Sequence, residues 1–117
     1  MLSCLYMNHQ EYITHLRTRT PSAPNFDVIG RAYKNAQGID EIIFLHSCYW
    51  DYVAWLEDTT DIKFAEWVVH CDNNPSEGHT LSHLLMHWLW TDECNRFREG
   101  LPTPYPYPPM GYEGWAN

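Results

Sequence analysis

Cationic side chains and glycine are both scarce in this chain. Only 7 of its 117 residues are Lys or Arg, against 15 Asp or Glu, which gives a formal net charge of −8. Direct binding to nucleic acid is not expected, because neutralising phosphates requires clustered Lys and Arg. The 6 glycines form no phosphate-binding loop, and no GxSxG sequence is present. We therefore predict a protein that is not an enzyme.

Long apolar runs and paired cysteines are also missing. No stretch approaches the roughly 20 apolar residues of a membrane-spanning helix, and the first seven residues do not resemble a signal peptide. The four cysteines lie far apart and form no CxxC pair, which argues against a disulfide scaffold or a zinc ribbon. These features predict a cytoplasmic protein with buried free thiols, no cofactor and no membrane contact.

Acidic and aromatic residues, in contrast, are abundant and concentrated. Residues 40–93 contain eleven carboxylates and a single cation, Lys63, so this block carries a charge of −10. The same block holds five of the six tryptophans. Because apolar residues make up 44% of the chain, disorder of the main body is excluded.

Helical spacing dominates residues 1–100, which we predict to form one domain. Capping residues and apolar side chains three or four apart predict five helices, over about 9–18, 26–37, 40–58, 60–72 and 77–99. The apolar run 42–45 is also compatible with a buried strand. The predicted fold is all-α, a compact bundle of four or five helices. Eight apolar side chains are expected to be mostly buried: Ile42, Phe44, Val53, Val69, Leu84, Leu85, Trp88 and Leu89.

The last stretch, 101–117, is predicted to be an extended tail rich in proline and tyrosine. Five prolines fall between Pro102 and Pro109. Such a segment favours the polyproline conformation, which has no internal hydrogen bonds. Its aromatic rings either pack back onto the body or face a partner, and packing back is favoured because it removes apolar area from water.

Three histidines, His79, His83 and His87, recur at four-residue spacing on the last predicted helix. This spacing places imidazoles on one face, where His83 and His87 with a donor from another helix suit a zinc or iron ion. Buried structural histidines are the favoured interpretation, and a pH-sensitive contact with a partner is also open. A metal-binding helical-bundle enzyme or sensor is therefore the alternative function.

Four carboxylates and one indole form the predicted partner-binding site near the junction of the third and fourth helices. On a helix, Asp40, Asp51 and Asp58 fall on one ridge. Aromatic anchors among carboxylates suit docking onto a basic surface, where the rings bury area and the charges steer the encounter. A solvated acidic face without a partner is the plain alternative. The predicted site residues are Asp40, Asp51, Trp55, Asp58 and Asp61.

Size, charge and aromatic content together predict an interaction protein. The expected partner is a larger protein or ribonucleoprotein with a basic, nucleic-acid-handling surface, which this chain would block as an inhibitor. Phage anti-defence proteins of the anti-CRISPR kind and bacterial immunity or antitoxin proteins share this profile, as an analogy of class only. Homo-oligomerisation, with the tail reaching a neighbouring copy, is also compatible with the sequence.

Overall fold

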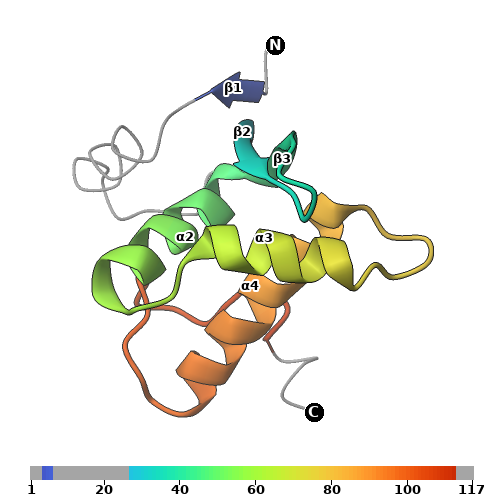
Figure 1. Ribbon diagram of the computed structural model, residues 1–117. Helices are drawn as coiled ribbons and strands as arrows, with labels where there is room; N and C mark the ends of the chain where they lie inside the picture. Colours follow the sequence, from blue (N-terminus) through green and yellow to red (C-terminus); the bar gives the residue numbers. More distant parts are fainter. Residues whose placement is uncertain (1–3, 7–26, 113–117) are drawn as a thin grey trace.

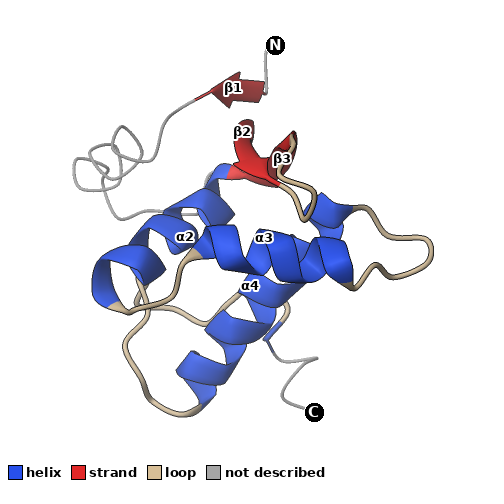
Figure 2. Ribbon diagram, in the orientation of Figure 1, coloured by secondary structure: helices blue, strands red, loops and turns tan. Residues whose placement is uncertain are grey.

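The computed structural model describes residues 4–6 and 27–112, and it contains both strands and helices (Figure 1). Three strands form one sheet in the order β1-β2-β3, with the bounds β1 Cys4–Tyr6, β2 Val28–Lys34 and β3 Asp40–His46. Three helices follow, α2 Ser47–Thr59, α3 Phe64–Asn73 and α4 Leu81–Arg98. The predicted all-α bundle of four or five helices is therefore wrong (Figure 2).

The main error concerns residues 28–46, where β2 and β3 form an antiparallel hairpin instead of helix. Strand alternation explains it, since a spacing of four residues is also two full pleats, so Ile29 and Tyr33 satisfy either period. The open alternative of a strand over 42–45 is the correct one. β1 pairs in parallel with β2, whereas the helix predicted over 9–18 lies outside the described residues.

The hairpin turn is stabilised by its own polar groups. The side-chain oxygen of Asn35 accepts hydrogen bonds from the backbone N–H groups of Gln37 and Ile39, at 2.9 and 3.0 Å. Gly38 adopts a φ of 78°, a left-handed conformation that glycine tolerates without strain. Gly38, which directly follows the helix predicted over 26–37, therefore closes a hairpin.

The helices begin later than the sequence suggested. α4 begins after Thr80, whose hydroxyl accepts the N–H of His83 at 3.1 Å. α3 has no cap from Lys63, and instead the Glu57 carboxylate on α2 accepts the N–H of Phe64 at 2.7 Å, satisfying one of the donors left open at a helix start. Within the described residues, no helix is long and apolar enough to cross a membrane.

The core lies between one face of the hairpin and the three helices (Figure 1). Trp50 is completely buried and its indole N–H donates to the carbonyl oxygen of Ile29 at 2.7 Å. Arg31 is also buried, with its guanidinium over the ring of Trp50 at 5.1 Å. This arginine therefore does not neutralise surface carboxylates.

Of the eight side chains expected in the core, some are buried and others are exposed. Val53, Leu85 and Leu89 are buried, and Ile42 and Leu84 are partly exposed. The prediction is wrong for Phe44, Val69 and Trp88, which are 48%, 36% and 37% exposed. Phe44 alternates with the buried Ile43 and Leu45, so it points to the other face of the sheet.

Residues 101–112, called the C-terminal strap below, return along α4 toward α2 (Figure 1). Tyr105 is buried in the strap, and its hydroxyl donates to a carboxylate oxygen of Asp51 at 2.8 Å. The indole N–H of Trp90 donates to the carbonyl oxygen of Met110 at 2.6 Å. Of the two arrangements that the sequence left open, this part of the tail packs onto the body.

Candidate functional site

The structure separates the five residues predicted to bind a partner. Asp40 begins β3 and forms an ion pair with Lys34 at 2.9 Å, while Asp51 and Asp58 lie on α2. A common helical ridge therefore does not exist, because the first residue belongs to a strand. Asp58 and Asp61 are exposed, at the end of α2 and in the connection to α3.

Asp51 is completely buried, so the expectation that its carboxylate faces outward is wrong. The hydroxyl of Tyr105 donates to it from the strap. Such a bond matters because a buried carboxylate without donors costs several kcal/mol. The apolar positions around Asp51 on α2 are those that pack into the core, which explains its direction.

Trp55 is half-buried and already has a cationic neighbour within the protein. The Arg96 guanidinium lies 5.6 Å from the centre of its ring, and Arg96 donates to Asp92 at 2.8 Å. Asp92 also accepts the hydroxyl of Tyr52 at 2.6 Å. This network joins α2 to α4. Arg96 covers the side of the Trp55 ring that was expected to meet a partner.

A different pair of indoles, one exposed and one half-buried, lies between α3 and α4. The rings of Trp67 and Trp88 meet edge to face, with centres 5.4 Å apart, and His70 lies 5.0 Å from Trp88. Neither indole N–H donates a hydrogen bond within the described part of the chain. We call this surface the indole face. Its shallow hollow is lined by Trp67, His87, Trp88, Thr91, Asp92 and Asn95.

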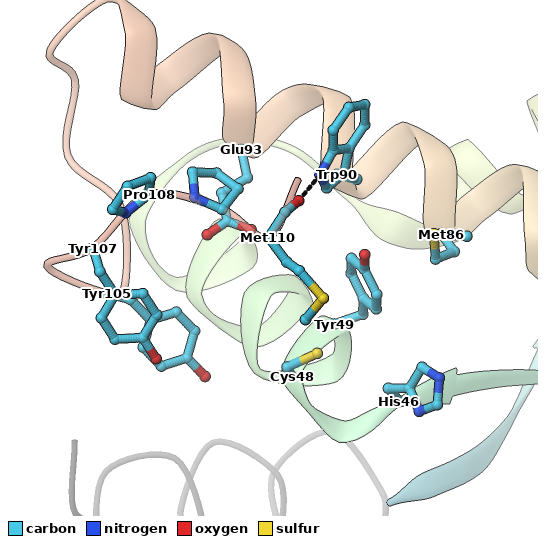
Figure 3. Close-up of a pocket in the computed structure, with 11 residues that line it drawn as sticks. His46, Cys48, Tyr49, Met86, Trp90, Glu93, Tyr105, Tyr107, Pro108 and Met110 are labelled. Carbon is cyan, nitrogen blue, oxygen red and sulfur yellow. Dashed lines mark hydrogen bonds between the residues drawn. The ribbon is translucent and has the colours of Figure 1, made fainter. Parts of the chain in front are cut away.

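The second candidate is an apolar cavity of about 230 Å³ beneath the strap (Figure 3). Its walls come from the start of α2, the middle of α4 and the strap itself, with His46 at the end of β3. The Met110 side chain extends toward Cys48 and Tyr49 in this view (Figure 3). The lining residues are His46, Cys48, Tyr49, Met86, Trp90, Glu93, Tyr105, Tyr107, Pro108, Pro109 and Met110.

Burial changes the protonation of the polar groups in this strap cavity. It raises the pKa of Glu93 to about 7, helped by the neighbouring charge of Asp92. Burial, with the charges of Asp51 and Glu93, raises the pKa of Cys48 to about 11. Near neutral pH, Cys48 is therefore a thiol rather than the nucleophilic thiolate, and Glu93 is divided between its two forms.

Cys71 and His70 are adjacent in sequence but have different surroundings. Cys71 is buried, and its pKa is raised by that burial, whereas the neighbouring His70 packs against Trp88. Burial and the charge of Glu93 raise the pKa of Cys94 to about 11. The geometry of these thiols gives no support to covalent catalysis.

His79, His83 and His87 are all exposed, so they are not the buried structural histidines that the sequence left open. The rings of His79 and His83 stack with centres 4.5 Å apart. Among residues 4–6 and 27–112, no group of three or more His, Cys, Asp or Glu side chains is placed to hold a metal ion. The geometry therefore offers no support to the alternative function.

The sequence interpretation missed the indole face and the carboxyl in the strap cavity. Trp88 was assigned to the core because apolar residues surround α4, although Trp67 and His70 at i and i+3 on α3 mark a matching aromatic stripe. Glu93 stands three residues after Trp90, a spacing that places both on one side of α4. No pattern available in the sequence reveals that the strap covers that side.

Comparisons of the chain with protein-family models, with curated proteins and with solved structures give no match. The functional argument consequently depends on the geometry and chemistry of these two surfaces.

Proposed function

We propose that the chain is an acidic interaction protein that inhibits a larger protein or ribonucleoprotein by occupying its basic, nucleic-acid-handling surface. The observation that carries the proposal is the exposed Trp88, which packs edge to face on the half-buried Trp67, on a chain with a net charge of −8. Exposed indoles beside carboxylates suit a contact in which rings are buried and opposite charges meet.

The two indoles supply the contact area. Trp88 is 37% exposed, and covering it removes apolar surface from water at roughly 25 cal/mol per Å². The N–H groups of Trp67 and Trp88 have no acceptor among the described residues, whereas those of Trp50 and Trp90 donate to backbone oxygens. Trp residues with this combination are frequent among the dominant contacts of protein interfaces.

Exposed carboxylates in the first turn of α3 and in the connection before it supply the electrostatic attraction. Asp61 and Glu66 are exposed at the start of α3, and Lys63 is the one cation between them. Asp92 lines the hollow beside Trp88, but its charge is already paired with Arg96. A basic partner would be steered toward this side at low ionic strength, and salt would weaken the association.

An inhibitor that acts by occupying a site needs no reacting group of its own, so the raised pKa values of the thiols are compatible with the proposal. The class of function proposed is that of phage anti-defence proteins or of bacterial immunity and antitoxin proteins, acting in the cytoplasm. The carboxylates retained from the predicted site are Asp58 and Asp61, with Trp67 and Trp88 in place of Trp55.

Affinity capture from a lysate of the source cells tests the proposal. Wild type is compared with Trp88→Ala and with Ile39→Ala, which removes a more exposed apolar side chain from the hairpin turn. We expect wild type and Ile39→Ala to capture a basic nucleic-acid-binding protein, and Trp88→Ala to lose at least about tenfold in yield. The captured protein should be released between about 0.05 and 0.5 M salt and displaced by its nucleic acid.

Two outcomes would contradict this function. Equal capture by the Trp88→Ala and wild-type proteins would remove the indole face from the interface. Inability of nucleic acid to displace the captured protein would show that the occupied surface is not its nucleic-acid site.

A further inference from the structure

The strap cavity has the dimensions of a site for a small molecule. Its volume of about 230 Å³ lies below the 300–1,000 Å³ of pockets for drug-sized ligands, so a single-ring compound suits it. Trp88 and Trp90 are separated by about 200° around α4, so the cavity and the indole face lie on opposite sides of this helix. A ligand in the cavity would therefore leave the indole face uncovered.

Aromatic rings make up much of the cavity wall. Tyr105 and Tyr107 stack with ring centres 5.3 Å apart on the strap side, and Tyr49 and Trp90 approach from α2 and α4 (Figure 3). Such walls favour a flat apolar body, because aromatic pairs add about 0.5–1.5 kcal/mol to area burial alone. The faces of these rings also attract a cation.

The carboxyl of Glu93 is the ionisable acid in this lining. No hydrogen bond or ion pair from the described part of the chain reaches it. Asp92 and Cys94 flank it on α4. The other titratable groups around it are His46 at the end of β3, Cys48, Tyr49 and Tyr52 on α2, and Tyr105 and Tyr107 on the strap.

A half-buried carboxyl that has no partner among the described residues is most effectively satisfied by a cation that donates hydrogen bonds to it. An anionic ligand would meet repulsion from Glu93 and Asp92, and a neutral ligand would leave the carboxyl without its counter-charge. The shape of the walls and the charge together therefore select a cationic ligand with an aromatic body.

We propose that the strap cavity binds a small arylalkylamine, with its ammonium group at the Glu93 carboxylate and its ring between Tyr49, Trp90 and the strap tyrosines. The ammonium replaces the missing partner of the carboxyl, and the ring replaces water against apolar walls. This site is separate from the proposed inhibitory contact, and either one can fail without the other.

Calorimetric titration with 2-phenylethylamine at about pH 8 tests the proposal, since an alkylammonium with a pKa near that of Lys, about 10.4, stays protonated there. The neutral 2-phenylethanol, the anionic 3-phenylpropionate and n-butylamine, which lacks the ring, are titrated in parallel. We expect the aromatic amine to bind at least about tenfold more tightly than any of the three.

The variant Glu93→Gln keeps the size of the side chain and should abolish the preference for amine over alcohol. The matched control Glu99→Gln, at an exposed position on the same helix end, should keep it. With a pKa of about 7 for Glu93, affinity for the amine should rise about tenfold from pH 6 to pH 8. The pH dependence that remains in Glu93→Gln measures the share of all other groups.

Several results would overturn the site. These are equal affinity for amine and alcohol, tighter binding of the anion, n-butylamine binding as well as the aromatic amine, or an unchanged preference in Glu93→Gln. Absence of binding by all four probes at about 5 mM would do the same, because a fragment that fills such a cavity should bind near 1 mM.

Discussion

The two sides of α4 use similar residues for opposite purposes. On one side, Trp90 and Glu93 are covered by the strap, and the indole N–H is bonded to Met110. On the other side, Trp88 and Asp92 border an open hollow, and the indole N–H meets no acceptor in residues 4–6 and 27–112. An acid and an indole one turn apart therefore do not by themselves indicate a docking surface, because the segment that packs over them decides their role.

The largest expected contrast is between the two indoles. Trp90→Ala should lower the free energy of unfolding by about 3 kcal/mol, because it removes a cavity wall and the hydrogen bond to the strap. Trp88→Ala should cost less than about 1 kcal/mol, since more than a third of that side chain is exposed. Urea unfolding of both variants measures the difference, and similar losses would mean that the strap adds little stability.

The next largest effect is expected from removing the hydrogen bond between the strap and α2. Tyr105→Phe should cost about 2 kcal/mol, because it removes a donor from the buried carboxylate of Asp51. Tyr49→Phe is the matched control, as the Tyr49 hydroxyl has no hydrogen bond within the described residues, and it should cost less than about 0.5 kcal/mol. Thermal unfolding of the two variants distinguishes them, and an equal shift in Tm would argue against the strap bond.

The third prediction concerns how stability depends on pH through the Glu93 carboxyl, on the side of α4 that the strap covers. The pKa of Glu93 rises from 4.5 to about 7 on folding, so ionising this group destabilises the fold as pH increases through that interval. Relative to wild type, Glu93→Gln should therefore gain stability between about pH 4.5 and 7, reaching about 2 kcal/mol above pH 7. Glu99→Gln should follow wild type at each pH, and a Glu93→Gln difference independent of pH would refute the raised pKa.

The smallest effect is expected on the open side. Asp61→Asn should change stability by less than about 0.5 kcal/mol, since the residue is exposed and outside the helices. It should nevertheless slow association with a captured basic partner about twofold at low salt and have no effect at high salt. Stopped-flow kinetics at two ionic strengths measure this, and equal slowing at both would show a direct contact instead of steering.

Much of the helical half was predictable from the sequence, whereas the hairpin was not. Three of the predicted helices overlap α2, α3 and α4, because their apolar spacing continues for ten or more residues. The helix prediction for residues 28–46 was wrong because apolar pairs four residues apart fit a strand as well as a helix. Asn35 and Gly38 formed the available turn signal, since together they fit a hairpin loop better than a helix end.

The candidate site was harder to predict, because the direction in which its side chains point depends on contacts between segments distant in sequence. Asp51 is buried through a residue 54 positions away, and no local pattern records this pairing. Trp55 is covered by Arg96 on α4 for the same reason. Asp58 and Asp61 were correctly expected at the surface, since charged residues at the end of a helix and in a connection are usually exposed.

The bond between Tyr105 and Asp51 has a consequence for biosynthesis. At about 5–20 residues per second, a ribosome completes residue 105 roughly 3–11 s after residue 51. During that interval the Asp51 carboxylate on α2 lacks the hydrogen bond that the Tyr105 hydroxyl later donates. The core of the nascent chain is therefore complete only after the strap has been translated. A chain that terminates before Tyr105 would leave the Asp51 carboxylate without this donor, and we expect such a product to be degraded.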